Sequence, residues 1–147
     1  MITKKTPSRQ RGVAAVEFAL VCSLLFTVLF GVMEMGRLLW TWNAAVEATR
    51  YGARLAVVCD KNDPHIKTQM IGRLPSLAAN NITITYQNPP AANNTCTAAD
   101  CKAVTVSLTG YTHTTIIPFL PLSLTLPPFR TTLRKEFMNS AANGVCQ

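Results

Sequence analysis

Three groups of residues in this sequence could do chemistry. Glu17 precedes a stretch, from Phe18 to Met33, that contains no charged side chain. A carboxylate next to hydrocarbon is costly unless a cation pairs with it, so such an acid suggests a function. Five cysteines could form disulfides or bind zinc. Two histidines, His65 and His113, could titrate or bind metal.

The position of the cysteines favours disulfides. Cys22 lies within the uncharged stretch and is expected to act there as a small apolar side chain. The other four, an even number, follow that stretch. Cys96 and Cys101 would close a short loop, which favours Cys96–Cys101 together with Cys59–Cys146. Three connectivities remain possible for four cysteines.

Neither a metal site nor an enzyme is expected. The cysteines form no CxxC pair, and neither His65 nor His113 stands near a cysteine in a ligand pattern. Both histidines are interpreted as ordinary surface or sheet residues. The sequence contains no nucleophile–base pair, phosphate-binding loop or metal cluster, so we expect no cofactor and no small-molecule substrate.

The stretch that follows Glu17 is long enough to cross a membrane. About 20 apolar residues in a helix span the roughly 30 Å hydrocarbon core of a bilayer. Trp40 and Trp42 follow, where a membrane–water interface is expected to place aromatic residues. We therefore divide the chain into a basic leader (1–12), a transmembrane segment (13–36), a soluble continuation of the helix (37–58) and an extracytoplasmic α+β domain (59–147).

The positive charge of the chain is concentrated before this stretch. The net charge is +7, and Lys4, Lys5, Arg9 and Arg11 all precede the apolar residues. Without residues 1–12, ten basic and seven acidic residues would remain. No basic stripe alternates with aromatics, so a nucleic-acid partner is not expected. A positive flank instead predicts a cytoplasmic N-terminus and a single pass through the membrane.

The remaining pattern predicts an α+β fold in which a long helix, 13–58, packs its second half on a small antiparallel sheet. Asp63 is a good N-cap and Pro64 suits the first turn of a second helix, 65–79, which Pro75 limits or kinks. Alternating residues predict strands at 82–86 and 103–109, the latter continuing past Gly110. The proline-rich segment 116–129 is expected as an extended loop or edge over the sheet, and 130–138 as a third strand.

Three blocks of sequence carry a family resemblance. Gly12 stands directly after the basic residues and five positions before Glu17, an order that resembles the signal of prepilins in the type IV pilin superfamily. The block from Gly12 to Leu20, the block Met33-Glu34-Met35-Gly36-Arg37 and the block from Ala48 to Ala56 together resemble the TadE-like family. That family comprises minor pseudopilins of the tight-adherence (Flp) pilus system.

The resemblance implies cleavage by a prepilin peptidase between Gly12 and Val13, with the helix left in the bacterial inner membrane. It implies a C-terminal domain on the periplasmic side, and as partners membrane lipid, other pilins or pseudopilins and the pilus assembly machinery. Cleavage would create an ammonium group on Val13, and Glu17 of a neighbouring subunit could neutralise it in lipid.

Alternatives remain at this point. Glu17 could instead reach the cytoplasmic interface beside Arg11 without a partner subunit. The chain could be an uncleaved bitopic inner-membrane scaffold of a secretion system, or an exported binding protein with an ordinary signal peptide.

Overall fold

The computed structural model describes residues 11–89, 96–97, 99–117, 121–136, 138–141 and 143–146. Most of the expected leader, residues 1–10, lies outside the described residues. The chain divides into two compact units, Met1–Arg37 and Leu38–Gln147, which we describe separately. The boundaries that we drew between leader, membrane segment and soluble continuation stay predictions.

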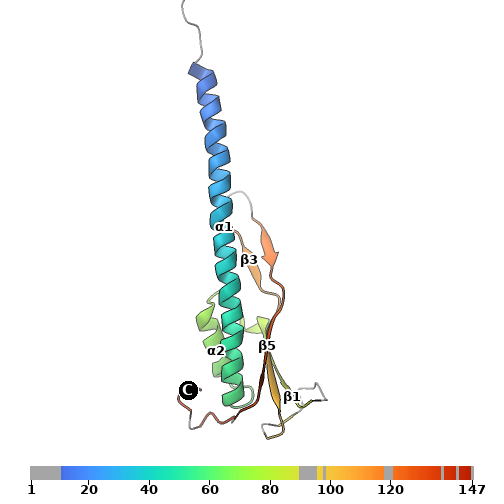
Figure 1. The fold of residues 1–147 in the computed structure, drawn as a ribbon. Coiled ribbons are helices and arrows are strands. Elements are labelled where there is room, and N and C mark those ends of the chain that lie inside the picture. Colours follow the sequence, from blue (N-terminus) through green and yellow to red (C-terminus); the bar gives the residue numbers. More distant parts are fainter. Residues whose placement is uncertain are drawn as a thin grey trace, which may run out of the picture. The chain divides into compact units, whose positions relative to one another are not determined.

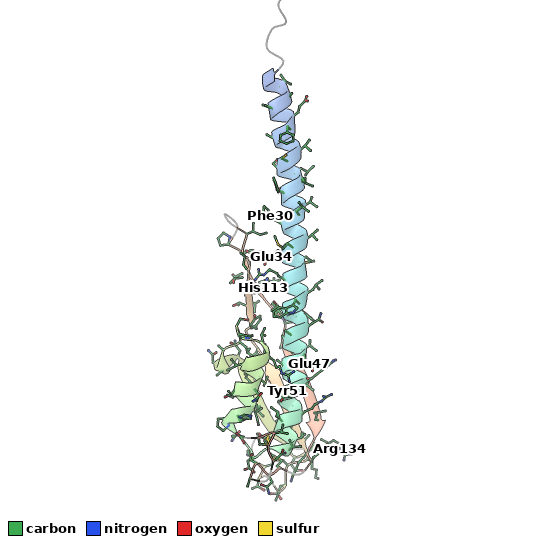
Figure 2. The ribbon with its side chains drawn as sticks, turned by 90° about the vertical axis from the view of Figure 1, so that its left-hand side faces the viewer. Phe30, Glu34, Glu47, Tyr51, His113 and Arg134 are labelled. Atoms are coloured by element: carbon green, nitrogen blue, oxygen red, sulfur yellow. A yellow bond between two sulfur atoms is a disulfide. The ribbon has the colours of Figure 1, made fainter. Side chains whose placement is uncertain are left out.

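One helix, α1 (Arg11–Val58), runs through both units, as the sequence predicts (Figure 1). In the first unit its large apolar side chains are exposed, and Figure 2 shows them projecting on all sides. The hydroxyls of Ser23 and Thr27 donate to the backbone carbonyls of Leu20 (2.8 Å) and Ser23 (2.7 Å) of the same helix. Since these hydroxyls are satisfied internally, this part of α1 suits an apolar solvent.

In the second unit α1 contributes small side chains to the core. Ala45, Ala48, Ala53 and Ala56 are fully buried. At Gly52 an added Cβ would overlap the side chain of Met70, which belongs to α2 (Pro64–Arg73). The missing side chain therefore allows the two helices to approach each other closely.

Helix α2 begins as predicted and ends earlier. Asp63 is its N-cap, and the Asp63 carboxylate accepts a hydrogen bond from the backbone N–H of His65 at 2.9 Å. The helix ends at Arg73 rather than continuing to Ala79, because Leu74 leaves the helical conformation one residue before Pro75. A 3₁₀ turn, η1 (Ala79–Asn81), then leads into the first strand.

The main sheet has three antiparallel strands in the order β1 (Ile82–Gln87), β2 (Ala103–Leu108) and β5 (Phe129–Arg134). Ile82 pairs with Leu108, and Leu108 in turn pairs with Phe129. Val104, Val106 and Leu108 face the core, as their alternation predicts. The fold is α+β, with a long N-terminal helix, a second short helix and small antiparallel sheets.

The expected continuation of β2 past Gly110 is wrong. β2 ends at Leu108, and Gly110 has φ +66°, a left-handed conformation that turns the chain. β3 (Thr112–Thr114) then pairs with β4 (Ser123–Thr125) in a separate two-stranded sheet. Thus part of the proline-rich segment forms a strand, and the third strand of the main sheet ends at Arg134 instead of continuing to residue 138.

Candidate functional site

The sequence singled out Gly12, Val13 and Glu17, and the structure places all three in the first turns of α1. Val13 and Glu17 are four residues apart, so they lie on one side of the helix, about 6 Å apart along its axis. Val13 is 61% exposed, and Glu17 is exposed as well. An added Cβ at Gly12 would meet nothing within 4 Å. Both the backbone at Gly12 and the Glu17 carboxylate are therefore accessible to another molecule.

The Gly12–Val13 bond lies within the helix, whereas a peptidase needs an extended substrate at the bond it cuts. The first N–H groups of a helix have no carbonyl partners within it, so the end of a helix unwinds at low cost.

Farther along α1, a second acid is paired. Nη1 of Arg37 donates to Oε1 of Glu34 at 2.6 Å, and the two residues are i,i+3 neighbours on the helix. This pair follows the uncharged stretch directly. The long apolar run is therefore followed by a neutralised pair of charges.

The cysteines beyond the apolar stretch form two disulfides. Cys59 joins Cys146 with a Cα–Cα distance of 5.6 Å, and Cys96 joins Cys101 with a distance of 5.2 Å. These are the two pairs that the sequence favours, while Cys22 is a free cysteine. The disulfides attach the end of α1 to the C-terminal tail and close the loop before β2.

The Cys96–Cys101 loop is also held by cations. Nζ of Lys61 donates to the Cys96 carbonyl at 2.6 Å, and Nζ of Lys135 donates to the Ala99 carbonyl at 3.1 Å. The same Lys61 ammonium lies 5.5 Å from the ring centroid of Tyr86. Burial of the Tyr86 phenol raises its pKa above the ordinary value. These contacts stabilise the loop.

The histidines are placed apart. His65 lies on α2, where its Nε2 is 3.0 Å from Nε2 of Gln69, and His113 is buried on β3. Among the residues that the structure describes, no group of three or more histidine, cysteine or acidic side chains could hold a metal ion.

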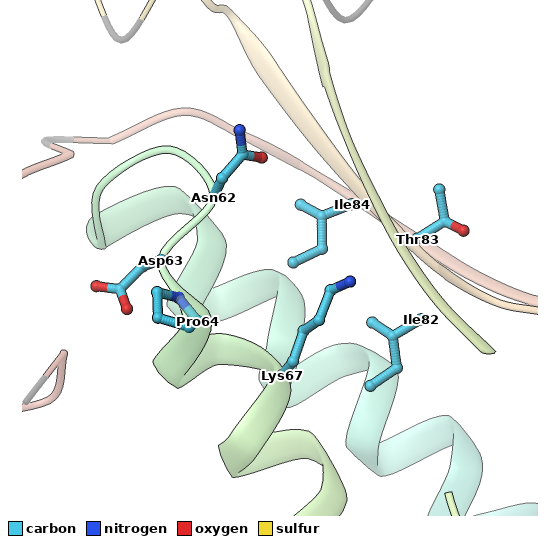
Figure 3. A pocket seen from close by; sticks show the side chains of 7 residues that line it. All are labelled: Asn62, Asp63, Pro64, Lys67, Ile82, Thr83 and Ile84. Carbon is cyan, nitrogen blue, oxygen red and sulfur yellow. The ribbon is translucent and has the colours of Figure 1, made fainter. Parts of the chain in front are cut away.

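An open pocket lies between the start of α2 and β1 (Figure 3). Its lining comes from both elements and from the loop before α2: Asn62, Asp63, Pro64, Lys67, Ile82, Thr83 and Ile84. Figure 3 shows the Lys67 side chain extending toward β1, while the Asp63 carboxylate points away from the pocket. The Asp63 carboxylate is instead engaged by the backbone N–H of His65 as the cap of α2.

Sequence reasoning missed the partner of Asp63. The Ser140 hydroxyl donates to Oδ2 of Asp63 at 2.7 Å and accepts the backbone N–H of Asp60 at 2.8 Å. The hydrogen bond from Ser140, followed by that from the His65 N–H, lowers the pKa of Asp63 below its ordinary value. A single serine in an irregular tail carries no pattern that could have shown this contact.

By length and composition, the helix segment Gly12–Val58 could cross a membrane, and its most apolar window is entirely unburied. Such a helix is compatible with a single-pass membrane protein.

Comparison with known proteins bears on the same segment. Residues 12–54 match the family model described as TadE-like protein, and the match includes Gly12, Val13 and Glu17. No curated protein and no solved structure matches the chain. The family suggests involvement in tight-adherence pilus systems. The resemblance seen in the sequence is therefore confirmed for this segment: residues 12–54 are TadE-like.

Proposed function

We propose that this protein is a membrane-held minor pseudopilin that takes part in the assembly of a tight-adherence (Flp) type IV pilus used in surface adhesion. The observation that carries the proposal is the coincidence of the TadE-like match, residues 12–54, with one uninterrupted helix. The first half of that helix exposes its apolar side chains, and its second half belongs to the core of a folded unit. A chain built this way can be held in a membrane and present a domain outside it.

The proposed orientation rests on charge and on cysteine chemistry. Four basic residues precede the apolar stretch, which favours a cytoplasmic N-terminus at the bacterial inner membrane. Both disulfides lie beyond that stretch. Disulfides persist in oxidising compartments such as the periplasm, so both features support a periplasmic location of the second unit.

The proposed processing step gives Glu17 its role. Hydrolysis of the Gly12–Val13 bond by a prepilin peptidase would leave a free ammonium on Val13 at the start of an apolar helix. An isolated ammonium and an isolated carboxylate are each costly in a medium of low dielectric constant, and pairing them offsets much of that cost. If Glu17 of one subunit pairs with Val13 of the next, the pair also sets the register between subunits.

The first experiment is identification of the N-terminal residue of the protein from cells that contain the prepilin peptidase. We expect the mature chain to begin at Val13, and we expect Gly12→Leu to abolish processing. An intact Met1 would contradict the proposal in favour of an uncleaved bitopic scaffold. A start beyond residue 34 would favour an exported protein with an ordinary signal peptide.

The second experiment tests Glu17. We expect Glu17→Ala to be processed normally but to reduce the number of pili per cell strongly, as counted by electron microscopy. Glu47→Ala is a matched control, because Glu47 is an exposed carboxylate on the same helix in the second unit. Normal piliation in the Glu17→Ala strain would refute the pairing, and equal loss in both strains would show that the effect is not specific to Glu17.

A further inference from the structure

The β3–β4 hairpin exposes an apolar surface that neither the family match nor the core of the fold uses. Residues 112–129, which contain both strands, include no acidic or basic residue apart from His113, which is buried. Within this segment Ile116 is 71% exposed, Leu122 58% and Leu124 48%. Three large aliphatic side chains on one small hairpin are more than scattered surface residues, and such patches mark contact with protein or lipid.

Two contacts within the second unit show in which direction β5 runs along α1. The ring of Phe129, at the start of β5, lies 5.0 Å from the ring of Trp42 on α1. At the other end of β5, the N–H of Glu136 donates to the carbonyl of Val57 at 3.3 Å. β5 therefore runs antiparallel to α1, and its start lies at the end of the unit where α1 enters.

The hairpin is an extension of the sheet at that end. Leu108, the last residue of β2, pairs with Phe129, so the chain between them leaves the sheet beside Trp42. The N–H of Leu126 donates to the carbonyl of Tyr111 at 2.8 Å and holds the base of the hairpin together. Figure 1 shows the two strands leaving the sheet on the side of the unit where α1 enters.

The helix exposes apolar side chains at the same end. Leu39 is 58% exposed and Trp40 65%. We call these two residues together with Ile116, Leu122 and Leu124 the apolar end of the second unit. A Trp with aliphatic neighbours is the composition found where proteins meet the membrane–water interface.

Part of the hairpin backbone is hydrogen-bonded within the hairpin itself. Thr115 donates its N–H to the Leu122 carbonyl at 3.0 Å, and its hydroxyl oxygen accepts the Leu122 N–H at 3.0 Å. Pro121, Pro127 and Pro128 bring no N–H donor at all. These paired groups need no water, and the side chains of the hairpin rather than its backbone are expected to enter the lipid.

We propose that the apolar end of the second unit contacts the surface of the bilayer that α1 crosses, with Ile116 and Leu122 inserted among the lipid chains. The occupant is lipid because Leu39 and Trp40 follow the last residue of the uncharged stretch, Met33, by only six and seven residues in the chain, so membrane insertion of that stretch brings these residues to the bilayer surface. The hairpin is then a second membrane contact that restrains the orientation of the second unit. This inference rests on the membrane location in the proposed function.

The experiment measures the depth of nitroxide labels in the full-length chain, embedded in nanodiscs of phosphatidylethanolamine and phosphatidylglycerol. Cys22 carries a free thiol, so a label there reports on the apolar helix itself. In a Cys22→Ala background, labels at Ile116→Cys and Leu122→Cys report on the hairpin. A label at Arg134→Cys, an exposed position at the other end of β5, is the matched control. For each label we compare two collision rates. One is the rate with oxygen, which concentrates in lipid, and the other is the rate with a water-soluble nickel chelate.

We expect the ratio of oxygen to nickel collision rates to be several-fold higher at Ile116, Leu122 and Cys22 than at Arg134. If the ratio at Ile116 and Leu122 equals that at Arg134 while the ratio at Cys22 is high, the hairpin contact is overturned but the membrane location of α1 is not. A label at Cys22 in water would overturn the proposed membrane location. Hairpin labels shielded from both reagents and broadened by neighbouring labels would show that a second copy occupies this surface, which also overturns the lipid contact.

Discussion

At the scale of single residues, Asp63 joins parts of the chain that lie far apart in sequence. Its carboxylate accepts the N–H of His65 at the start of α2 and the hydroxyl of Ser140, which is 77 residues away. Both hydrogen bonds favour the charged carboxylate, and the pKa of Asp63 is lowered accordingly. One side chain therefore caps a helix and holds the C-terminal tail.

Asp63→Ala tests the cap. We expect it to lower the free energy of unfolding of the second unit by about 1 kcal/mol, the usual cost of losing an N-cap side chain. Asp63→Asn should cost less, because the amide oxygen can still accept the N–H of His65. Chemical denaturation in detergent, followed by circular dichroism, gives the comparison. The exposed neighbour Asp60 provides the control Asp60→Ala, and equal losses for both alanine variants would contradict the role of Asp63.

The lowered pKa of Asp63 predicts the effect of acid. A carboxyl group whose pKa is lower in the folded state contributes its stabilisation above the pKa of the unfolded chain, about 3.9. That contribution is lost as the pH falls through the folded-state pKa. The wild-type protein should therefore lose more stability than Asp63→Asn between about pH 4 and lower values. Parallel pH profiles of the two proteins would disprove the assignment.

At the scale of elements, the packing of α1 on α2 depends on the absence of a side chain at Gly52. Both Gly52 and Met70 are buried, so neither can move into solvent to relieve a clash. Both helices could be predicted from the sequence, but their close approach could not. The sequence alone does not show why a glycine stands within a helix. At Gly52 the reason is the nearby side chain of Met70 on α2.

Gly52→Ala is expected to destabilise the second unit even though alanine is the better helix former. Overpacking of a buried contact costs about 1–3 kcal/mol. Gly72→Ala is the matched control, because an added Cβ there meets nothing within 4 Å, and it should be neutral or stabilising. Thermal unfolding of the two variants checks the difference.

Combining Gly52→Ala with Met70→Ala identifies the clash. If Met70 is the obstacle, the double variant should be more stable than the sum of the single effects predicts. Strict additivity would mean that the cost of Gly52→Ala arises elsewhere.

At the scale of the whole molecule, the two disulfides close loops of very different length. Cys59 and Cys146 are 87 residues apart in sequence, whereas Cys96 and Cys101 are five apart. A crosslink that closes a longer loop removes more conformational freedom from the unfolded chain. The long-range disulfide should therefore stabilise the second unit more than the short one.

Paired replacement of cysteines measures this difference. Cys59→Ala with Cys146→Ala should lower the free energy of unfolding by about 4–5 kcal/mol, and Cys96→Ala with Cys101→Ala by about 2 kcal/mol, on the chain-entropy scale. Denaturation in detergent under oxidising conditions gives both values. The opposite ranking, or four free thiols in the purified wild-type protein, would contradict this account.

The sequence by itself determined the features that depend on neighbouring residues. Spacing and local conformational preference account for four features: the uncharged stretch, the single long helix, the start of α2 at Asp63 and Pro64, and the side of β2 that faces the core. Gly12 and Glu17 could also be found this way. Their proposed partners are other molecules, so a single chain shows that they are accessible but not what they bind.

Tertiary structure alone decided the features that join distant residues. Local patterns could not predict that β2 stops at Leu108, that β3 pairs with β4, or that Ser140 donates to Asp63. The choice among three disulfide connectivities also depended on which cysteines folding brings within bonding distance. The physical reason is that long-range contacts must compensate the entropy of closing a loop, and packing across the whole core decides where that happens.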